Sequence, residues 1–376
     1  MNYRKMLMGQ CKRAVIKIGS RILTTDERRL DTDRIQDLAD EMVSVMKKRI
    51  EIVVVSSGAI SAGMGRLGLK KRPSDIPVKQ AAAAVGQGHL IWSYEEAFGR
   101  HKKKVAQILL TADDLKNRRR FLNARNALES LFYYKVIPII NENDTVVVEE
   151  IKFGDNDHLS ALVTNLVRAD LLLILSDVDG LYSRDPNLHQ DAHLIPMVEK
   201  VTDKVIAMAG DSMSGIGTGG MRSKVLTART AAAFGTPTLI IGGHQKGAIQ
   251  AAFQGEEIGT LFLAGKDPLS SRKHWIAYTL NTKGSLHLDA GAAEALLKKG
   301  KSLLPSGIKA VSGRFEIGDP VSCLGPRGEE IARGLVNYHS YEIEKIMGRK
   351  TGEIEKILGY KYYDEVIHRD NLVILE

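Results

Sequence analysis

Two lysines in this chain occupy positions from which they could hold an anion. Lys17 lies within the apolar run of residues 14–18, and Lys224 follows the glycine-rich stretch of residues 217–220. A helix is predicted to begin at about residue 221, and the N-terminal amides and dipole of a helix attract anions. The string GTGGMRSK does not have the spacing of a Walker A loop. The two lysines and the glycines therefore predict a phosphate site of another kind.

Three polar loops add groups that could bind a substrate or orient the lysines. NENDT (141–145) and LSDVDGLYSRDP (175–186) each follow an apolar run, and FGDNDHLSA (153–161) precedes a predicted helix. Ligands of an open parallel sheet gather at the carboxyl ends of its strands. The successive lysines, glycines and acidic loops are typical of a phosphoryl-transfer site that works by positioning and charge.

Each of these features also has a simpler interpretation. Lys17 could lie on an edge strand and face water, since its long side chain can reach solvent. Asp157 could only cap a helix, because aspartate is a favoured N-cap residue. The Asp-Gly pair at 179–180 could form a turn that leads into a hairpin. The residues alone leave these alternatives open.

Apolar runs and helical periodicities alternate along the first 265 residues. Continuous apolar runs, as at 51–55 and 169–175, predict buried strands, whereas the spacing of apolar residues over 32–48 and 221–233 predicts helices. This alternation predicts an α/β fold in which helices cover both faces of a mostly parallel open sheet.

The pattern changes near residue 265, where Gly, Pro and Ser become frequent. We therefore expect one domain over residues 1–265 and a linker over 266–282. Short runs interrupted by glycines then predict a small, mainly-β domain over 283–360. Residues 361–376 are expected to form a folded tail, because their last segment is apolar.

Composition narrows the class of protein. The chain has 376 residues, of which 44% are hydrophobic, and it contains no apolar run long enough to span a membrane. It has two cysteines, Cys11 and Cys323, and its N-terminus lacks the pattern of a secretory signal. These features predict a cytoplasmic protein. The net charge of +8 suits either anionic metabolites or nucleic acid, and the run RRR (118–120) is best explained as a solvated surface.

Several longer motifs resemble the amino acid kinase family: VSSGAISAG, IPIINENDTV, FGDNDHLSALV, LSDVDGLY and GTGGMRSK. The later stretch KGSLHLDAG…VSGRFEIGDPVSCL is similar to a PUA domain. Within the kinase family the match is closest to members that phosphorylate L-glutamate. The resemblance implies transfer of the γ-phosphoryl group of ATP to the side-chain carboxylate of L-glutamate, the first step of proline biosynthesis, with proline as feedback inhibitor. A member acting on acetylglutamate or aspartate is the alternative.

The same resemblance assigns roles to individual residues. It implies Lys17, Asp157 and Lys224 as catalytic residues. It implies Ser57, Asp144 and Asn156 as residues that bind glutamate. The implied ATP-binding residues are Lys17, Ser176, Asp177, Thr218, Gly219, Gly220, Met221, Arg222, Ser223 and Lys224. Mg²⁺ is expected to accompany ATP on the nucleotide phosphates, so no protein metal ligand is named.

The resemblance also implies a homo-oligomer, either a dimer or a tetramer. RNA binding by the PUA-like region is not predicted, because residues 283–376 contain 14 Lys and Arg against 14 Asp and Glu, and RNA affinity depends heavily on phosphate contacts. An RNA-binding protein whose kinase-like part is inactive is the competing hypothesis. Intact Lys17, Asp157 and Lys224 argue against it, since an inactive site has no chemical need for all three.

Overall fold

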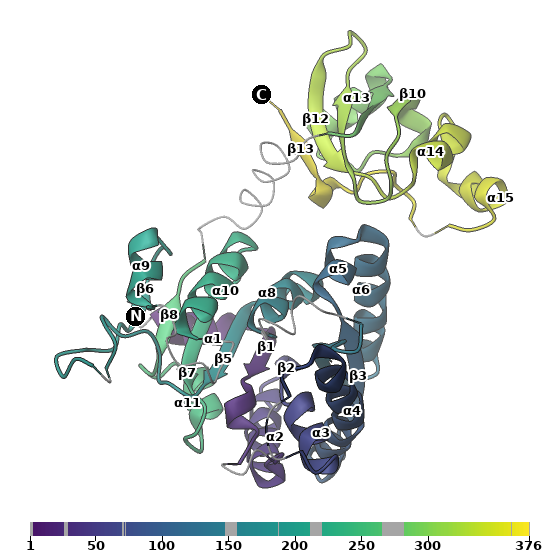
Figure 1. Ribbon diagram of the computed structural model, residues 1–376. Helices are drawn as coiled ribbons and strands as arrows, with labels where there is room; N and C mark the ends of the chain where they lie inside the picture. The colour runs from purple at the N-terminus through teal and green to yellow at the C-terminus, as the bar shows by residue number, and fades with distance from the viewer. Residues whose placement is uncertain are drawn as a thin grey trace. The chain divides into compact units, whose positions relative to one another are not determined.

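The chain forms two compact units in a computed structural model (Figure 1). One unit comprises Met1–Leu115 and Ala124–Lys266, and the other comprises Lys116–Asn123 and Asp267–Glu376. The structure describes residues 3–25, 29–69, 71, 73–146, 156–186, 188–210, 220–264, 282–361 and 363–375.

The first unit is built on a mostly parallel sheet. Its strands are β1 (Arg13–Ile18), β2 (Glu51–Ser56), β3 (Lys104–Leu110), β4 (Val136–Glu142), β5 (Leu171–Ser176), β6 (Met197–Val198), β7 (Thr238–Gly242) and β8 (Thr260–Phe262). They lie in the order β3-β4-β2-β1-β5-β7-β8-β6, and β7 with β8 is the antiparallel pair among them. The predicted fold class is confirmed. The chain first builds outward from β1 on one side and then returns to β1 through β5, so β1 lies beside the point where the strand order reverses.

Helices cover both faces of this sheet (Figure 1). On one face lie α1 (Tyr3–Gln10), α2 (Thr32–Met46), α3 (Ala59–Arg66), α4 (Ile76–Gly99) and α11 (Ala248–Gln254). On the other lie α8 (Asn156–Val167), α10 (Met221–Ala233), α9 (Asp203–Met208), which packs on α10, and the part of α6 (Arg118–Tyr133) that belongs to this unit. The short α5 (Ala112–Lys116) precedes α6. The two layers bury the continuous apolar runs of the strands, which is why those runs do not alternate with polar residues.

The pleat of β1 decides which way Lys17 points. Ala14, Ile16 and Ile18 belong to the core that includes residues of α2, α4 and α11. Because side chains alternate along a strand, Lys17 faces the layer of α8 and α10 instead. β1 is hydrogen-bonded to β2 on one side and β5 on the other, and Lys17 is 4% exposed. The edge-strand interpretation of Lys17 is therefore wrong.

Helices α3 and α4 cross in backbone contact. A Cβ atom at Gly63 would lie 1.7 Å from the Ala82 carbonyl oxygen, and one at Gly86 would lie 1.8 Å from the Ala59 carbonyl oxygen. No side chain larger than hydrogen fits at either position without moving a helix. The two glycines thus fix where α4 runs relative to the segment that follows β2.

The second unit has its own sheet and core. Its elements are β9 (Gly284–Leu288), α13 (Ala290–Lys299), β10 (Ile308–Gly313), β11 (Pro320–Leu324), β12 (Glu330–Leu335), α14 (Ser340–Ile346), α15 (Ile354–Leu358) and β13 (Leu372–Ile374). The strand order is β10-β9-β11-β12-β13, with β9 and β11 parallel. The sheet confirms the prediction of a small, mainly-β domain. β13 pairs with β12, so residues near the C-terminus form an edge strand of this sheet.

We predict that Gly86→Ala destabilises the protein, because its methyl group would push α3 and α4 apart. Overpacking of this kind costs typically about 1–3 kcal/mol. Gly88→Ala, two residues along α4, is the matched control. A Cβ atom there meets nothing within 4 Å, and alanine is favoured over glycine inside a helix by about 0.5–1 kcal/mol. Denaturant unfolding measures both variants, and equal midpoints would contradict the helix contact.

Candidate active site

A buried carboxylate shared by two ammonium groups forms the centre of the site. Asp157 Oδ1 is paired with Lys17 Nζ, and Asp157 Oδ2 lies 3.1 Å from Lys224 Nζ. The Asp157 side chain is fully buried, and the two lysines are 4% and 5% exposed. Together these three groups carry one net positive charge. A buried charge is stabilised by pairing, so this cluster is suited to an additional anion.

Three separate elements bring these residues together. Lys17 lies near the carboxyl end of the central strand β1, Asp157 is the second residue of α8, and Lys224 lies one turn into α10. Asp157 thus lies inside the helix and is paired with both lysines, so the simpler interpretation that it only caps the helix is wrong. Helix α8 contacts both β1 and α10. These contacts hold the first turns of α8 and α10 near the carboxyl end of β1.

The start of α10 contributes a second anion-binding feature. Gly220 precedes the helix with extended backbone angles (φ −65°, ψ 176°), and Met221, Arg222 and Ser223 form its first turn. The positive end of the helix dipole therefore lies within one turn of Lys224. The predicted ATP-binding residues Thr218 and Gly219 lie outside the described residues.

Asn156 anchors a polar network on the other side of Asp157. Its Nδ2 donates to the Ser56 carbonyl oxygen (2.8 Å), to Ser57 Oγ (3.0 Å) and to Asn141 Oδ1 (2.8 Å). Its Oδ1 is buried and accepts no hydrogen bond from the described residues. Asp144 is half-buried on the loop after β4. The structure therefore brings Asn156 and Ser57 together.

Ser176 and Asp177 form a third part of the site at the end of β5. Ser176 is 1% exposed, and its Oγ donates to Asp177 Oδ1 (3.2 Å). Arg21 Nη1 lies 2.5 Å from Asp177 Oδ2. Burial acts to raise the pKa of the Asp177 carboxyl, but the hydrogen bond and charge of Arg21 outweigh burial and hold that pKa below its ordinary value. Asp177 is therefore ionised at neutral pH and fixed in direction.

Sequence reasoning missed several of these partners. Arg21, Gln87 and Asn141 received no individual role, although each makes hydrogen bonds within the site or to it. Asn141 carried the clearest signal, because it is a polar residue at the end of the apolar run of β4. Gln87 had none, because a single glutamine in a helix usually faces water.

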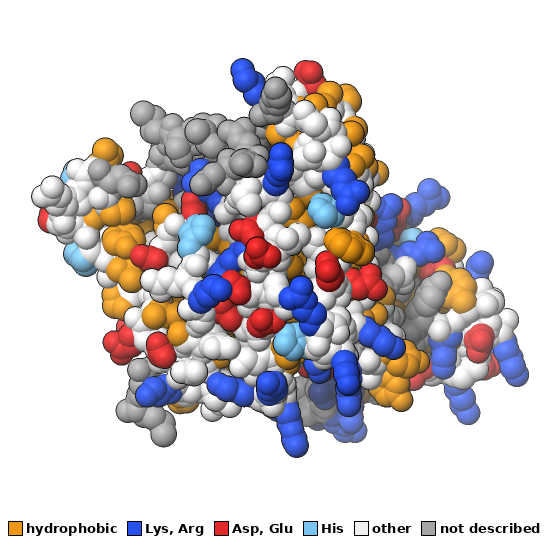
Figure 2. Space-filling view, turned by 90° about the horizontal axis from the view of Figure 1, so that it is seen from below, with side chains coloured by type: hydrophobic (Ala, Val, Ile, Leu, Met, Phe, Trp, Pro, Cys, Tyr) orange, Lys and Arg blue, Asp and Glu red, His pale blue; other side chains and the backbone are white. Residues whose placement is uncertain are grey.

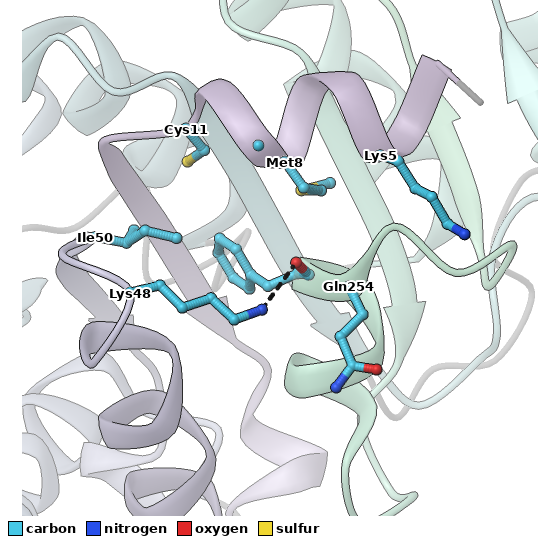
Figure 3. Close-up of a pocket in the computed structure, with 8 residues that line it drawn as sticks. Lys5, Met8, Cys11, Lys48, Ile50 and Gln254 are labelled. Atoms are coloured by element: carbon cyan, nitrogen blue, oxygen red, sulfur yellow. Dashed lines mark hydrogen bonds between the residues drawn. The ribbon is translucent and has the colours of Figure 1, made fainter. Parts of the chain in front are cut away.

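The first unit also has hollows on its surface. One of about 390 Å³ is lined by Lys5, Met8, Gly9, Cys11, Lys48, Ile50, Phe253 and Gln254 (Figure 3). Cys11 and Ile50 precede β1 and β2, so this hollow lies at the opposite strand ends from Lys17 and Ser57. Another, of about 560 Å³, lies between α9 and α10 and includes Arg222.

The described residues contain no group of three or more His, Cys, Asp and Glu side chains that could hold a metal ion. None of the helices in the described ranges is long and apolar enough to cross a membrane. On the face shown in Figure 2, Lys and Arg side chains are interspersed with Asp and Glu. The surface in that view is of mixed charge, as expected of a solvated surface.

Comparison with known proteins places the chain in a class. The sequence profile of the amino acid kinase family matches residues 12–242, and that of the PUA domain matches residues 284–358. The chain therefore belongs to the amino acid kinase family and carries a PUA domain after the kinase region.

Relatives that match the chain over nearly its full length show which members of the family it resembles. The chain is 56% identical over 372 residues to a protein of Trichlorobacter lovleyi named "Glutamate 5-kinase", covering 99% of each. It is 55% identical over 372 residues to the "Glutamate 5-kinase" of Geobacter metallireducens, covering 99% of this chain and all of that one. Within the family, the chain groups with the glutamate 5-kinases.

We predict that Asp157→Asn lowers stability by about 3–5 kcal/mol, because it leaves two buried ammonium groups without their shared carboxylate. Asp40→Asn is a control at an exposed ion pair, where Asp40 Oδ1 lies 2.6 Å from His101 Nε2 and its side chain is 51% exposed. We expect that change to cost about 0–1 kcal/mol. Thermal and denaturant unfolding at neutral pH give the stability of both variants. Similar losses of unfolding free energy in Asp157→Asn and Asp40→Asn would show that Asp157 is not essential to the cluster.

Proposed function

We propose that this enzyme transfers the γ-phosphoryl group of ATP to the side-chain carboxylate of L-glutamate, giving L-glutamyl 5-phosphate and ADP, the first step of proline biosynthesis. The observation that carries the proposal is the buried cluster of Lys17, Asp157 and Lys224 beside the start of α10. The relatives named glutamate 5-kinase, which match the chain over nearly its full length, support the choice of substrate.

The chemistry needs positioning and positive charge more than proton transfer. A glutamate carboxylate oxygen attacks the γ-phosphorus as the bond from that phosphorus to the bridging oxygen of ADP breaks. The attacking carboxylate is already ionised at neutral pH, so no general base is required. Lys17 and Lys224 offset the charge that spreads over the transferring group, and Asp157 holds both in direction.

Substrate recognition falls to Ser57, Asp144 and Asn156. Asn156 offers a buried acceptor, its Oδ1, and Asp144 offers a carboxylate. Both suit the N–H groups of an ammonium ion, because a charged donor strengthens a hydrogen bond. Proline also carries an α-amino and a carboxylate group, so we propose that it inhibits by occupying the same site.

ATP binds along the start of α10 and the end of β5. The residues assigned to it are Lys17, Ser176, Asp177, Thr218, Gly219, Gly220, Met221, Arg222, Ser223 and Lys224. Mg²⁺ accompanies the nucleotide and neutralises phosphate charge when bound.

The proposal extends to the organisation of the chain. Residues 1–265 form the catalytic domain, 266–282 a linker, 283–360 the PUA domain and 361–376 a C-terminal tail, which contributes β13 to the sheet of the second unit. It assigns no RNA to the PUA domain. Both cysteines are free and buried, and burial raises the pKa of each thiol to about 12. Unreactive thiols of this kind suit a reducing compartment, and we place the reaction in the cytoplasm.

The direct test is ATP-dependent formation of γ-glutamyl hydroxamate from L-glutamate and hydroxylamine, with ADP release followed in parallel. Hydroxylamine traps the acyl phosphate before it cyclises. Both products should rise together, stop when glutamate is omitted, and fall when proline is added. Turnover of acetylglutamate or aspartate without turnover of glutamate would overturn the substrate assignment.

We predict that Lys224→Ala lowers kcat by roughly 10²–10³-fold while the fold stays intact, because its charge acts mainly in the transition state. Lys246→Ala is the control, since Lys246 is 80% exposed and pairs with Asp37 on the surface. The hydroxamate assay gives kcat for both variants. A folded Lys224→Ala enzyme with near-normal kcat would remove Lys224 from the catalytic group.

An exposed apolar stripe on α4 supports a homo-oligomer. Val78, Val85 and Trp92 are 39%, 42% and 54% exposed and follow one another at intervals of seven residues. Two turns of a helix take about seven residues, so the three lie on one face. Exposed apolar stripes of this kind are typical of association surfaces. We therefore place a contact between copies of the chain, in a dimer or tetramer, on this stripe.

Trp92→Glu should shift the protein toward a smaller species, because it places a charge within that apolar contact. Leu188→Glu tests the same chemical change at a residue that is 77% exposed and lies outside α4. Size-exclusion chromatography with light scattering measures both masses. An unchanged mass for Trp92→Glu would exclude the stripe as the contact.

A further inference from the structure

We propose that Gln87, a buried residue of α4, is a positioning residue that fixes the direction of the Asn156 carboxamide and so makes the site specific for a free amino group. This inference rests on the proposed function and names what selects the substrate there. Gln87 is 7% exposed although it lies among apolar residues of α4. A buried amide is costly unless its hydrogen bonds are made, so its partners are informative.

Gln87 is hydrogen-bonded at both ends of its amide. Its Nε2 donates to the Glu142 carbonyl oxygen (3.2 Å). Its Oε1 accepts from Asn141 Nδ2 (3.2 Å) and from Gln107 Nε2 (3.3 Å). A carbonyl oxygen can only accept, so the NH₂ group of Gln87 must face Glu142. The oxygen of Gln87 must then face Asn141.

Asn141 passes this direction on to Asn156. Because its NH₂ group is directed at Gln87, its Oδ1 points the other way and accepts from the Glu142 backbone N–H (2.8 Å) and from Asn156 Nδ2 (2.8 Å). The Ser56 carbonyl oxygen, 2.8 Å from the same Nδ2, requires the same orientation of Asn156. The chain of amides from α4 through β4 to α8 therefore has one consistent direction.

The consequence for the ligand concerns Asn156 Oδ1, the acceptor that this network of amides leaves without a donor. The NH₂ group of Asn156 is used by Ser56, Ser57 and Asn141, whereas its buried Oδ1 accepts nothing from the described residues. A buried acceptor without a donor is unfavourable, so the site favours a ligand that brings N–H groups. An ammonium group brings three N–H donors and a positive charge. An acylated nitrogen brings one N–H donor and no charge, and its acyl group adds a carbonyl oxygen.

Gln87 acts at a distance, because its hydrogen bonds reach the site through Asn141 and the Glu142 backbone. It is also well held, since its neighbour Gly86 lies at the backbone contact between α3 and α4. The prediction is therefore a loss of substrate affinity and selectivity, with the chemical step preserved. Lys17, Asp157 and Lys224 are not in this chain of amides and should be unaffected.

The first variant, Gln87→Leu, removes all three hydrogen bonds of the Gln87 amide at similar side-chain volume. We expect KM for L-glutamate to rise about tenfold, the change that the loss of roughly one buried hydrogen bond produces. We expect kcat and KM for ATP to stay within about twofold. The ratio of kcat/KM for glutamate to that for acetylglutamate should fall. Gln36→Leu, which removes a surface hydrogen bond to Asp40, is the control.

The second variant, Gln87→Glu, tests the direction of the hydrogen bonds at position 87, whereas Gln87→Leu tests whether they are needed at all. Its carboxyl can accept from Asn141, but it can face the Glu142 carbonyl oxygen only when protonated. Burial and that oxygen both raise the pKa of the introduced carboxyl, so the protonated form is present at low pH and lost as pH rises. KM for glutamate should therefore be near the wild-type value at about pH 6 and raised at about pH 9, a dependence on pH that the wild type lacks.

The outcomes separate this inference from the proposed function. Wild-type protein that neither turns over glutamate nor is stabilised by it against heat would overturn both. An active wild type with an unchanged KM in Gln87→Leu would overturn only the role of Gln87. Equal losses in kcat and in both KM values would show that Gln87 merely supports the fold. If Gln87→Leu does not fold, the pH dependence of KM in Gln87→Glu decides, and a flat profile refutes the inference.

Discussion

The shared Asp157 carboxylate is the constraint on which the rest of the site depends. Two ammonium groups cannot be buried side by side without an anion between them, because their mutual repulsion and desolvation both oppose folding. Asp157 supplies that anion from the second position of α8 and holds Lys17 of β1 and Lys224 of α10. The central place of β1 and the packing of α8 on both β1 and α10 are what bring the three together. The cluster is thus preorganised before any phosphate arrives, which is how a site stabilises transferring charge at little reorganisation cost.

The first turn of α8 joins two kinds of chemistry. Asp157 faces the lysines, while its neighbour Asn156 faces Ser57 and Asn141. Adjacent helix residues point about 100° apart, so one turn can serve a cationic region and an amide network at once. Helix α4 supports the second of these through Gln87, and its contact with α3 at Gly63 and Gly86 limits where Gln87 can lie.

Sequence patterns predicted much of the fold and part of the site, for physical reasons. Continuous apolar runs predicted β1, β2 and β5, because strands buried on both faces need no polar alternation. Helix α4 was missed: its many alanines and glycines give it almost no difference between faces. The direction of Lys17 and the pairing of Asp157 could not follow from local sequence, because they depend on strand order and on residues more than a hundred positions away. The same holds for Arg21, whose partner Asp177 is supplied by another strand end.

The polarity of the site has a consequence for how a bifunctional substrate lies in it. Positive charge is concentrated at Lys17 and Lys224, whereas the buried Asn156 oxygen offers an acceptor. A substrate with an ammonium group at one end and a carboxylate at the other is attracted in one orientation and repelled in the reverse one, because the buried groups are poorly screened. That orientation presents the carboxylate to the lysines. Binding and positioning of the reacting oxygen therefore follow from the same distribution of charge, and a ligand whose amino group has been neutralised loses both.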